Sequence, residues 1–513
     1  MLVTRTLTLL IVIQFVSGFT SCRKEETPIV NRPNILLAIA DDWGWPHAGT
    51  YGDRVVETPT FDRVASEGLL YTNAYVSSPS CTPSRAALLT GQWHWRLREG
   101  ANLWSTLSRD IPVYPDLLES AGYHVGFSGK GWGPGRFEVG GRERNPAGDE
   151  YQDFEDFLAS RSDQEPFCFW FGSLDPHRTY DEGSGLQSGI QQGAIELNPS
   201  FPDSPEVRGD VADYYFEVQR FDREVGKILS RIQAMGELEN TIVVVTSDNG
   251  MPFPRCKGNL YDGGDRVPLA IRWGQKLERG HVSEHFVSLT DLAPTFLTAA
   301  GLDPPEVMTG RRLREVVGRG DADAETPDRS FVLFGKERHV PSQEGDDGGG
   351  TPMRGLRTSD YLYIRNYRPD RWPAGTPNWK QAYFPGSWYG DVDNGPTKSY
   401  MIESRDRDQL HLELFNLAFA RRPGEELYDL KSDPAQQKNL ASDSVYEGIK
   451  KELSDRLERA LLESDDPRVT GAEIDFDTFP YYGGSPLHPT LAEAELVQRE
   501  SIDSPPSTTR KKQ

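Results

Sequence analysis

The stretch Asn34-Ile35-Leu36-Leu37-Ala38-Ile39-Ala40 is a continuous apolar run, and it is followed directly by Asp41-Asp42. An apolar run of this length that ends abruptly at charge predicts a strand covered on both faces, as in parallel sheets. Apolar residues also recur with helical spacing from residue 214 to residue 232, before Gly236, which predicts a helix that stops there. Strands that alternate with such helices indicate an α/β fold.

Two further apolar runs lead into polar residues in the same way. Residues 167–172 lead to His177, and residues 241–246 lead to Asp248 and Asn249. In open parallel α/β sheets, ligands bind beyond the carboxyl ends of the strands. We therefore expect these polar side chains to converge at one edge of the sheet.

The acidic pairs at these strand ends offer oxygen ligands of the kind that a hard divalent cation requires. Either pair taken alone, Asp41-Asp42 or Asp248-Asn249, is also typical of a helix cap or a turn. Metal binding becomes the favoured interpretation only when both pairs are considered with the cysteine motif described below.

We expect a large, mainly parallel sheet sandwiched by helices, followed by a smaller C-terminal α+β subdomain that carries a short antiparallel sheet. The glycine-rich acidic segment 344–350 is a loop signal near the division between the two parts. Beyond it, residues 362–365 and 426–430 alternate like short strands, and residues 445–462 have the pattern of an amphipathic helix. We expect a leader over residues 1–22, the α/β domain over 30–350, the C-terminal subdomain over 351–485 and a polar tail over 486–513.

The leader has Arg5, then an apolar segment from Leu7 to Val16, and small residues before Cys22. The apolar segment is too short to span a bilayer as a folded helix, so it predicts an export signal. The residues around Cys22 resemble a bacterial lipoprotein cleavage site, although Phe19 stands where leucine is usual. We expect a periplasmic or cell-surface lipoprotein anchored through Cys22, with simple secretion as the alternative.

Acidic residues outnumber basic ones, 78 to 56, which gives a net charge of −22. This balance argues against nucleic-acid partners, which require a basic surface. The chain has four cysteines, Cys22, Cys81, Cys168 and Cys256. A disulfide between the last two is one possibility, and an ordinary buried thiol at Cys168, which lies among aromatic residues, is the other.

The segment from Ser80 to Gly91 reads S-C-T-P-S-R-A-A-L-L-T-G. This pattern, C-x-P-S-R followed by small apolar residues and T-G, resembles the signature of the type I, formylglycine-dependent sulfatases of the alkaline-phosphatase-like superfamily. Further stretches resemble the same family in the expected order: residues 41–44, 128–130, 175–178, 247–254, 262–268 and 426–430. Within the family, residues 175–178 and 248–254 look most like the heparan N-sulfatase (sulfamidase) branch.

The resemblance implies that a formylglycine-generating maturation enzyme oxidises Cys81 to formylglycine (3-oxoalanine). The hydrated aldehyde would attack sulfur as a gem-diol and form a sulfoenzyme intermediate. One Ca²⁺ ion would be held by a ligand set that includes the modified residue: Asp41, Asp42, Cys81, Asp248 and Asn249.

The resemblance also assigns roles to charged residues around the nucleophile. Arg85 would hold the diol and the geometry of the metal ligands, while Lys130 and Lys257 would contact the sulfate oxygens. His177 would donate a proton to the bridging oxygen as a general acid.

One position departs from the family pattern. Many sulfatases read G-K-x-H where this chain has Gly129-Lys130-Gly131-Trp132, and an indole cannot act as a base. Either His47 or His124 enters the site in its place, or His177 serves both half-reactions, or turnover is slow. Trp132 is then a candidate for stacking on a sugar ring, together with four further tryptophans: Trp43, Trp45, Trp93 and Trp95.

We therefore expect a sulfatase that hydrolyses sulfate esters, with N-sulfate as a further option, of a sulfated saccharide derived from a polysaccharide. The first alternative is a phosphate or phosphonate monoester hydrolase of the same fold, since phosphate and sulfate esters are similar tetrahedral oxyanions. The second is a noncatalytic protein that binds sulfated glycans and keeps Cys81 unmodified.

Overall fold

The apolar run after residue 33 forms the central strand β1 (Asn34–Ala40), in which every residue is buried. The structure is a computed structural model that describes residues 32–318 and 329–491. The expected leader 1–22 with its Cys22 lies outside the described residues, as does the expected tail from residue 492 onward.

The large sheet has the strand order β4-β3-β5-β1-β6-β7-β2-β8. Its strands are β1 (Asn34–Ala40), β2 (Leu69–Tyr75), β3 (His124–Gly129), β4 (Asp149–Tyr151), β5 (Phe167–Gly172), β6 (Thr241–Ser247), β7 (Leu269–Arg272) and β8 (His281–Ser288). Neighbouring strands are parallel, except that β7 runs antiparallel to both β6 and β2. The predicted strands 34–40, 167–172 and 241–246 are thus adjacent, in the order β5-β1-β6.

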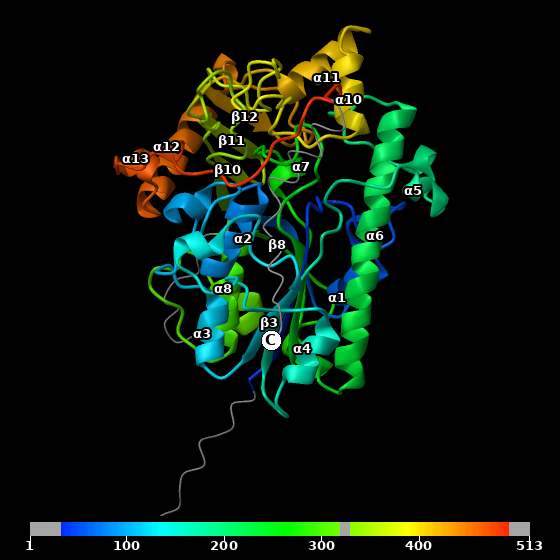
Figure 1. The fold of residues 1–513 in the computed structure, drawn as a ribbon, viewed down its shortest axis with the longest axis vertical. Coiled ribbons are helices and arrows are strands. Elements are labelled where there is room, and N and C mark those ends of the chain that lie inside the picture. The colour runs from blue at the N-terminus through cyan, green and yellow to red at the C-terminus, as the bar shows by residue number, and fades with distance from the viewer. Residues whose placement is uncertain (1–31, 319–328, 492–513) are drawn as a thin grey trace, which may run out of the picture. The chain divides into compact units, whose positions relative to one another are not determined.

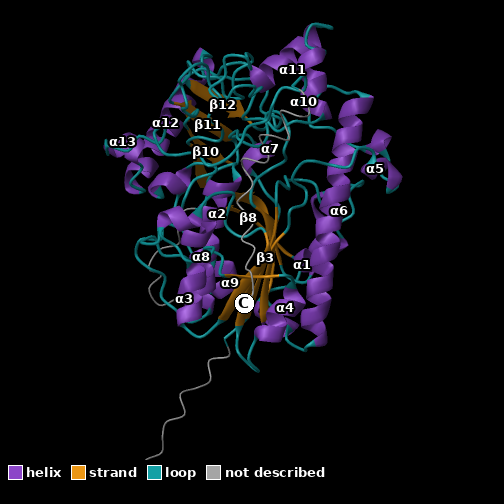
Figure 2. Cartoon of the chain, in the orientation of Figure 1, coloured by secondary structure: helices purple, strands orange, loops and turns teal. Residues whose placement is uncertain are grey.

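Helices cover both faces of this sheet (Figures 1 and 2). On one face the core includes residues of α2 (Cys81–Thr90), α3 (Tyr114–Ser120), α8 (Leu292–Ala299) and α9 (Arg314–Val317). On the other face it includes residues of α1 (Pro59–Ser66), α4 (Phe154–Ser160) and α6 (Pro205–Ala234). The predicted helix at 214–232 is part of α6, which begins earlier because Ser204 caps the N–H of Val207 before Pro205.

A second, antiparallel sheet has the order β12-β11-β10-β9. Its strands are β9 (Phe331–Lys336), β10 (Met353–Thr358), β11 (Tyr361–Asn366) and β12 (Glu425–Asp429). The helix α12 (Glu447–Glu463) packs Leu453, Leu457 and Leu461 on one face of it. The predicted fold, a large mainly parallel sheet between helices with a small antiparallel sheet, is confirmed.

The small sheet begins earlier than the expected division between residues 350 and 351. Strand β9 pairs with β10 along its whole length, so residues 331–336 belong to the small sheet. The glycine-rich segment 344–350 lies within the loop that joins these two strands and is not a border between two parts. A loop signal marks a chain reversal equally well within a sheet and between domains, which is why it misled the sequence interpretation.

The remaining helices are α5 (Ser184–Gln187), α7 (Asp262–Asp265), α10 (Pro396–Glu403), α11 (Gln409–Phe419) and α13 (Pro467–Thr470). Among the described residues, none of the helices combines the length and the apolar character needed to cross a bilayer. Cys168 and Cys256 are both free thiols, so the disulfide considered from the sequence does not form. They cannot meet because Cys168 packs on one face of the large sheet and Cys256 belongs to the core on the other.

Candidate functional site

Four adjacent parallel strands end at the same edge of the large sheet, in the order β3-β5-β1-β6. Lys130 follows β3 directly, and His177 lies in the loop after β5. The pair Asp41-Asp42 follows β1, and Asp248-Asn249 follows β6. The convergence predicted from the apolar runs is therefore found.

Cys81 is the first residue of α2, and this helix start is placed against the end of β1. Its Sγ atom lies 3.4 Å from Oδ1 of Asp41 and 3.8 Å from Oδ1 of Asp42. Asp42 has a φ of 78°, a left-handed conformation that costs a residue with a side chain of the order of 1 kcal/mol or more. Strain of this kind at a non-glycine residue is typical of functional sites, where the surrounding structure maintains it.

Arg85, one turn further along α2, connects two of the strand ends. Its Nε donates to Oδ2 of Asp248 at 2.7 Å, and its Nη1 donates to the carbonyl oxygens of Lys130 and Gly131 at 2.8 and 2.9 Å. The loop after β3 can lie this close because Gly172 of β5 has no Cβ, which would stand 1.8 Å from the Lys130 oxygen. Arg85 is fully buried, so its charge depends on these partners.

Two lysines each contact one carboxylate of the acidic pair. Lys130 Nζ lies 2.7 and 2.6 Å from the two oxygens of Asp41. Lys257 Nζ lies 2.7 Å from Oδ2 of Asp42, and His177 Nε2 lies 3.9 Å from the same oxygen. Lys130 and Lys257 thus place one positive charge next to each carboxylate that contacts Cys81.

The cations determine the ionisation of the site. Burial alone would raise the pKa of the Asp41 carboxyl, but Lys130 and the other nearby cations hold this pKa well below its usual range. Burial, with the Asp248 carboxylate next in importance, raises the pKa of the Cys81 thiol well above its ordinary value. A thiol in this environment stays protonated and is a poor nucleophile as encoded.

The donor set fits a hard divalent cation. Ligand atoms of Asp41, Asp42, Cys81 and Asp248 all lie within 4.8 Å of one another, and all four residues are buried. Asn249 adds a buried Oδ1 atom with no hydrogen-bond partner, while its Nδ2 donates to Asp42 at 2.6 Å. An unpaired buried oxygen beside three carboxylates is a ligand position, because leaving it unsatisfied is costly. No other such group of metal-binding side chains occurs in the part of the chain that the structure describes.

Trp132, a candidate for stacking on a sugar, packs in the core instead. Its indole is 4% exposed and belongs to the hydrophobic core on the α2 side of the large sheet. Both its backbone N–H and its carbonyl are hydrogen-bonded to the side chain of Asn145, each at 2.9 Å. Trp132, the second residue after the Gly129-Lys130 pair, is therefore turned into the hydrophobic core.

Neither of the alternative histidines takes the place of the missing base. His124 begins β3 and lies at the opposite end of that strand from Lys130, where Nε2 contacts the Phe157 carbonyl and Ser160. His47 is buried, and its Nδ1 contacts the Tyr215 hydroxyl at 2.8 Å and Asp53 at 3.3 Å.

The other candidate stacking residues are also occupied. Trp43 and Trp95 are fully buried. Trp45 is covered by the Arg266 guanidinium at 3.5 Å from the ring centroid, and Trp93 stacks on Trp95. Aromatic residues near a site are more often packing residues than binding surfaces, and these four follow that tendency.

The sequence interpretation missed two residues that come from the small-sheet part. His339, in the loop after β9, places Nδ1 2.8 Å from Oγ of Ser80, the residue before Cys81. Asp393 places Oδ2 3.6 Å from Nζ of Lys257. No motif surrounds either residue, so only the pairing of β9 with β10 and the folding of the chain after β11 bring them here.

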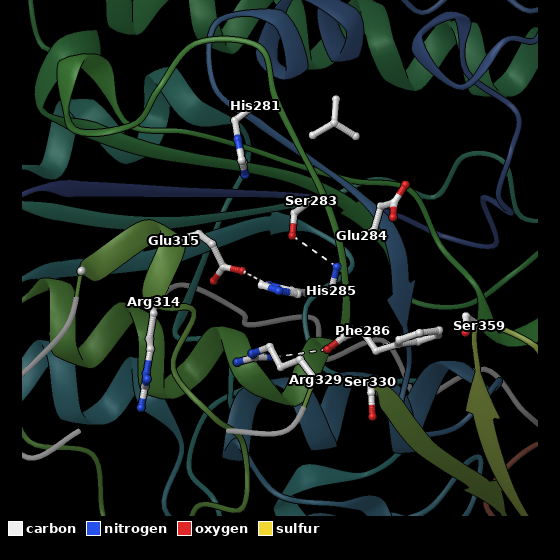
Figure 3. A pocket seen from close by; sticks show the side chains of 12 residues that line it. His281, Ser283, Glu284, His285, Phe286, Arg314, Glu315, Arg329, Ser330 and Ser359 are labelled. Carbon is white, nitrogen blue, oxygen red and sulfur yellow. Dashed lines mark hydrogen bonds and ion pairs between the residues drawn. The ribbon is translucent and has the colours of Figure 1, made fainter. Parts of the chain in front are cut away.

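A separate hollow lies along β8, at the edge of the large sheet (Figure 3). His281, His285, Glu315 and Arg329 are among its lining residues, and His285 Nδ1 contacts Glu315 at 2.6 Å. None of the predicted site residues lines it. The chemistry described above therefore belongs to the strand ends.

Buried carboxylates, lysines and one cysteine gather at the strand ends of the large sheet. This arrangement defines a hydrolase site for a tetrahedral oxyanion. Residues 33–134 and 148–302 match the Sulfatase family model, and residues 256–372 match the model of the C-terminal domain of N-sulphoglucosamine sulphohydrolase. The chain belongs to the sulfatase family and is a sulfuric ester hydrolase, as its motifs predicted.

Named relatives agree with this assignment, and a solved structure shares the fold. The human N-sulphoglucosamine sulphohydrolase is 30% identical over 500 residues, which cover 85% of this chain and 91% of the relative. An ulvan-active sulfatase of Formosa agariphila is 28% identical over 503 residues, covering 88% of this chain and 78% of the relative. A structure of a protein in complex with its substrate D-glucosamine-2-N,6-O-disulfate has a TM-score of 0.60 at 21% identity, covering 86% of this chain and all of that chain.

Proposed function

We propose that this sulfatase removes sulfate from a saccharide derived from a sulfated polysaccharide, with N-sulfated glucosamine among its substrates. The observation that carries the proposal is the position of Cys81 between Asp41 and Asp42, with Lys130 and Lys257 on the same carboxylates. Activity on N-sulfated glucosamine is supported by the match of residues 256–372 to the N-sulphoglucosamine sulphohydrolase C-terminal model and by the human relative.

We propose that Cys81 works after oxidation to formylglycine by a maturation enzyme. The hydrated formylglycine would supply a gem-diol, one hydroxyl of which attacks sulfur while the other expels sulfate afterwards. The start of α2 supports this role, because the positive end of a helix stabilises negative charge on its first residue.

We assign Asp41, Asp42, Asp248, Asn249 and the residue at 81 as the ligands of one Ca²⁺ ion, the cation that prefers several carboxylate and amide oxygens. When bound, the ion would polarise the sulfate and lower the pKa of the attacking hydroxyl.

The remaining residues bind the substrate and move protons. Lys130 and Lys257 would contact the sulfate oxygens and offset the charge that develops on them. His177 would give its proton to the leaving oxygen or nitrogen, and its side chain is 36% exposed, so a substrate can reach it. Arg85 would hold Asp248 and the loop after β3 in place.

With Trp132 buried and His47 and His124 held elsewhere, His177 is the histidine that we assign to both half-reactions. It contacts the acidic pair on the open side of the site. After proton donation it is neutral, which is the form needed to accept a proton from the second diol hydroxyl.

The test is expression with and without a formylglycine-generating enzyme, followed by mass spectrometry of the peptide that contains Cys81. Released sulfate is then measured from glucosamine N-sulfate, glucosamine 6-sulfate and an aryl sulfate, and phosphate from an aryl phosphate. We expect conversion of Cys81 and sulfate release that both disappear in Cys81→Ala. A preference for aryl phosphate by orders of magnitude would contradict the proposal in favour of a phosphate monoester hydrolase.

We also propose export, with a lipid anchor at Cys22, on the basis of the apolar segment and the cysteine that follows it. Radiolabelled palmitate should be incorporated in a bacterial host by the full chain and not by Cys22→Ala.

A further inference from the structure

The carboxylate of Asp393 stands at the open side of the site, next to the lysine that we assign to the sulfate. Lys257 Nζ lies between Oδ2 of Asp42 at 2.7 Å and Oδ2 of Asp393 at 3.6 Å. The Asp42 side chain is fully buried, whereas that of Asp393 keeps 23% of its surface exposed. Of the two carboxylates on Lys257, Asp393 is therefore the one that an arriving sugar can contact.

Asp393 has acceptor capacity that the protein leaves unused. Within the described residues its carboxylate makes the ion pair with Lys257 and no hydrogen bond. The nearby Arg178 does not fill this capacity, because its guanidinium is held by both oxygens of Asp210 at 2.7 and 2.8 Å. Exposed acceptors of this kind bind water or ligand.

The loop that carries Asp393 is fixed on both sides of it. Lys398 is buried, and its Nζ donates to the Trp388 and Val392 carbonyls at 2.8 and 2.7 Å and to Oδ1 of Asn394 at 2.8 Å. Asp391 accepts from the backbone N–H of Val340 at 2.7 Å, which ties this loop to the one that carries His339. A side chain presented by such a loop is preorganised, so little conformational entropy is lost when it binds a ligand.

The neighbours of Asp393 keep it ionised. Burial alone would raise the pKa of its carboxyl, but Lys257, His177 and His339 hold this pKa well below the usual range. The same carboxylate lies 3.6 Å from Nζ of Lys257, the lysine that we assign to the sulfate oxygens. A negative acceptor there attracts hydrogen-bond donors and repels anions.

We infer that Asp393 determines specificity: its carboxylate accepts a hydrogen bond from a hydroxyl or N–H group of the sugar beside the scissile sulfate, and it disfavours a second sulfate or a carboxylate at that position. The inference rests on the proposed function and specifies the substrate class further. The sugar it selects carries a free donor next to the group that is cleaved.

A purely supporting role makes different predictions. If Asp393 only held Lys257 in place, its removal would weaken the hydrolysis of every sulfate ester alike. An acceptor for the sugar affects only substrates that carry the donor. An aryl sulfate, which has no hydroxyl or N–H group beside the sulfate, separates the two roles.

The experiment compares Asp393→Asn with wild type and with Asp360→Asn, all with Cys81 converted. Asp360 is a matched control because it is also a carboxylate of the small-sheet part paired with a lysine, Lys431, at 3.0 Å. The substrates are 4-nitrophenyl sulfate, the monosulfated glucosamine that wild type hydrolyses fastest, and the same sugar with a second sulfate on the hydroxyl nearest the first.

For Asp393→Asn we expect kcat/KM on the monosulfated sugar to fall about 10- to 100-fold, mainly through KM, as for the loss of a charged hydrogen bond. The rate on the aryl sulfate should change less than about threefold, and the preference for the monosulfated over the disulfated sugar should narrow about tenfold. Asp360→Asn should match wild type on all three.

A binding measurement accompanies the kinetics. In the Cys81→Ala background, calorimetric titration with the monosulfated sugar should give a Kd about 10- to 100-fold higher when Asp393→Asn is added. Equal losses on the sugar and the aryl sulfate, or no loss on the sugar, would overturn the inference while sulfate release by wild type still supports the proposed function. If wild type released only phosphate, the proposed function would fail, and the inference with it.

Discussion

Two regions of the molecule meet at the site, and they are built differently. At the strand ends of the large sheet, Asp41 is paired with Lys130 and Asp248 with Arg85, and of these four side chains only that of Lys130 keeps appreciable exposure, 14%. In the loops of the small-sheet part, the Asp393 carboxylate has one ion-pair partner, Lys257 at 3.6 Å, and its side chain is partly exposed to solvent. The strand ends thus form a closed charge network suited to one reaction, and the loops offer single groups suited to selecting a substrate.

The difference follows from the architecture. Parallel strands place their carboxyl ends at one edge, so the residues after β3, β5, β1 and β6 must be neighbours. Loops on an added antiparallel sheet are not constrained in this way and can change without disturbing the charge network. We therefore expect substitutions at the strand ends to abolish the reaction and those in the loops to redirect it.

The largest effect should come from Asp248→Asn. Asp248 accepts from Arg85 and from the backbone N–H of Asp42 at 3.1 Å, and it is a proposed metal ligand. Without the Asp248 charge, the positive charge of the buried Arg85 lacks its nearest carboxylate partner. We therefore expect kcat/KM for sulfate release to fall about 10³-fold or more and the melting temperature to decrease. Asp360→Asn serves as the exposed control, and activity within tenfold of wild type would show that the network tolerates a missing charge.

Trp132→His tests whether the family histidine can be restored at its usual position. Because the indole is packed in the core, an imidazole there would leave a void and a buried polar group, and we expect a loss of about 2–4 kcal/mol in the free energy of unfolding. Urea denaturation measures this loss, and turnover of 4-nitrophenyl sulfate should not increase. A faster variant of undiminished stability would mean that the loop after β3 can turn its side chain toward Cys81.

A chelator tests whether the strand-end region holds the proposed calcium ion. With Ca²⁺ at about a hundred times its dissociation constant, the bound ion adds about 2.7 kcal/mol to stability, so a chelator should lower the melting temperature and abolish sulfate release. Calcium should restore both, and the Cys81→Ala, Asp248→Asn double variant should show little response to either reagent. Full activity in excess chelator would exclude the proposed metal.

His339→Ala tests the contact between the regions. His339 contacts the Ser80 hydroxyl from the small-sheet side. Because the substitution removes this one buried hydrogen bond next to Cys81, we expect kcat for sulfate release to decrease about three- to tenfold. His285→Ala, in the hollow of Figure 3, is the matched control, because His285 lies on β8 and contacts none of the site residues. A decrease as large as that of Asp248→Asn would place His339 in the catalytic network.

The sequence predicted the strand-end region well, and the reasons are physical. The apolar run of β1 and the acidic pair after it specify a buried strand and its carboxyl end without any knowledge of the rest of the chain. No sequence pattern marks Asp393. Its position depends on an ion pair with Lys257, which is remote in sequence, and on the hydrogen bond from Lys398 to the Val392 carbonyl in the same loop. The inward turn of Trp132 was equally hidden, since it depends on Asn145 holding the backbone on both sides.

The smallest expected effect is that of Glu217→Gln, which tests whether the charge network of the site ends before α6. Glu217 on α6 is buried beside Asp175, which lies in the same loop as His177, and both are paired with Arg220. Burial, followed by the proximity of Asp175, raises the pKa of Glu217 to about 8, and the more distant Asp181 adds to this, while Arg220 acts against it. The folded protein then keeps a proton that the unfolded chain releases near its ordinary pKa of 4.5, so this group's contribution to stability is lost as pH rises from about 5 to about 8. Glu217→Gln has no proton to lose, and its stability relative to wild type should rise across that interval in urea denaturation series at fixed salt. Parallel curves for the two proteins would mean that Glu217 ionises normally and that the network extends to α6 as an ordinary ion pair.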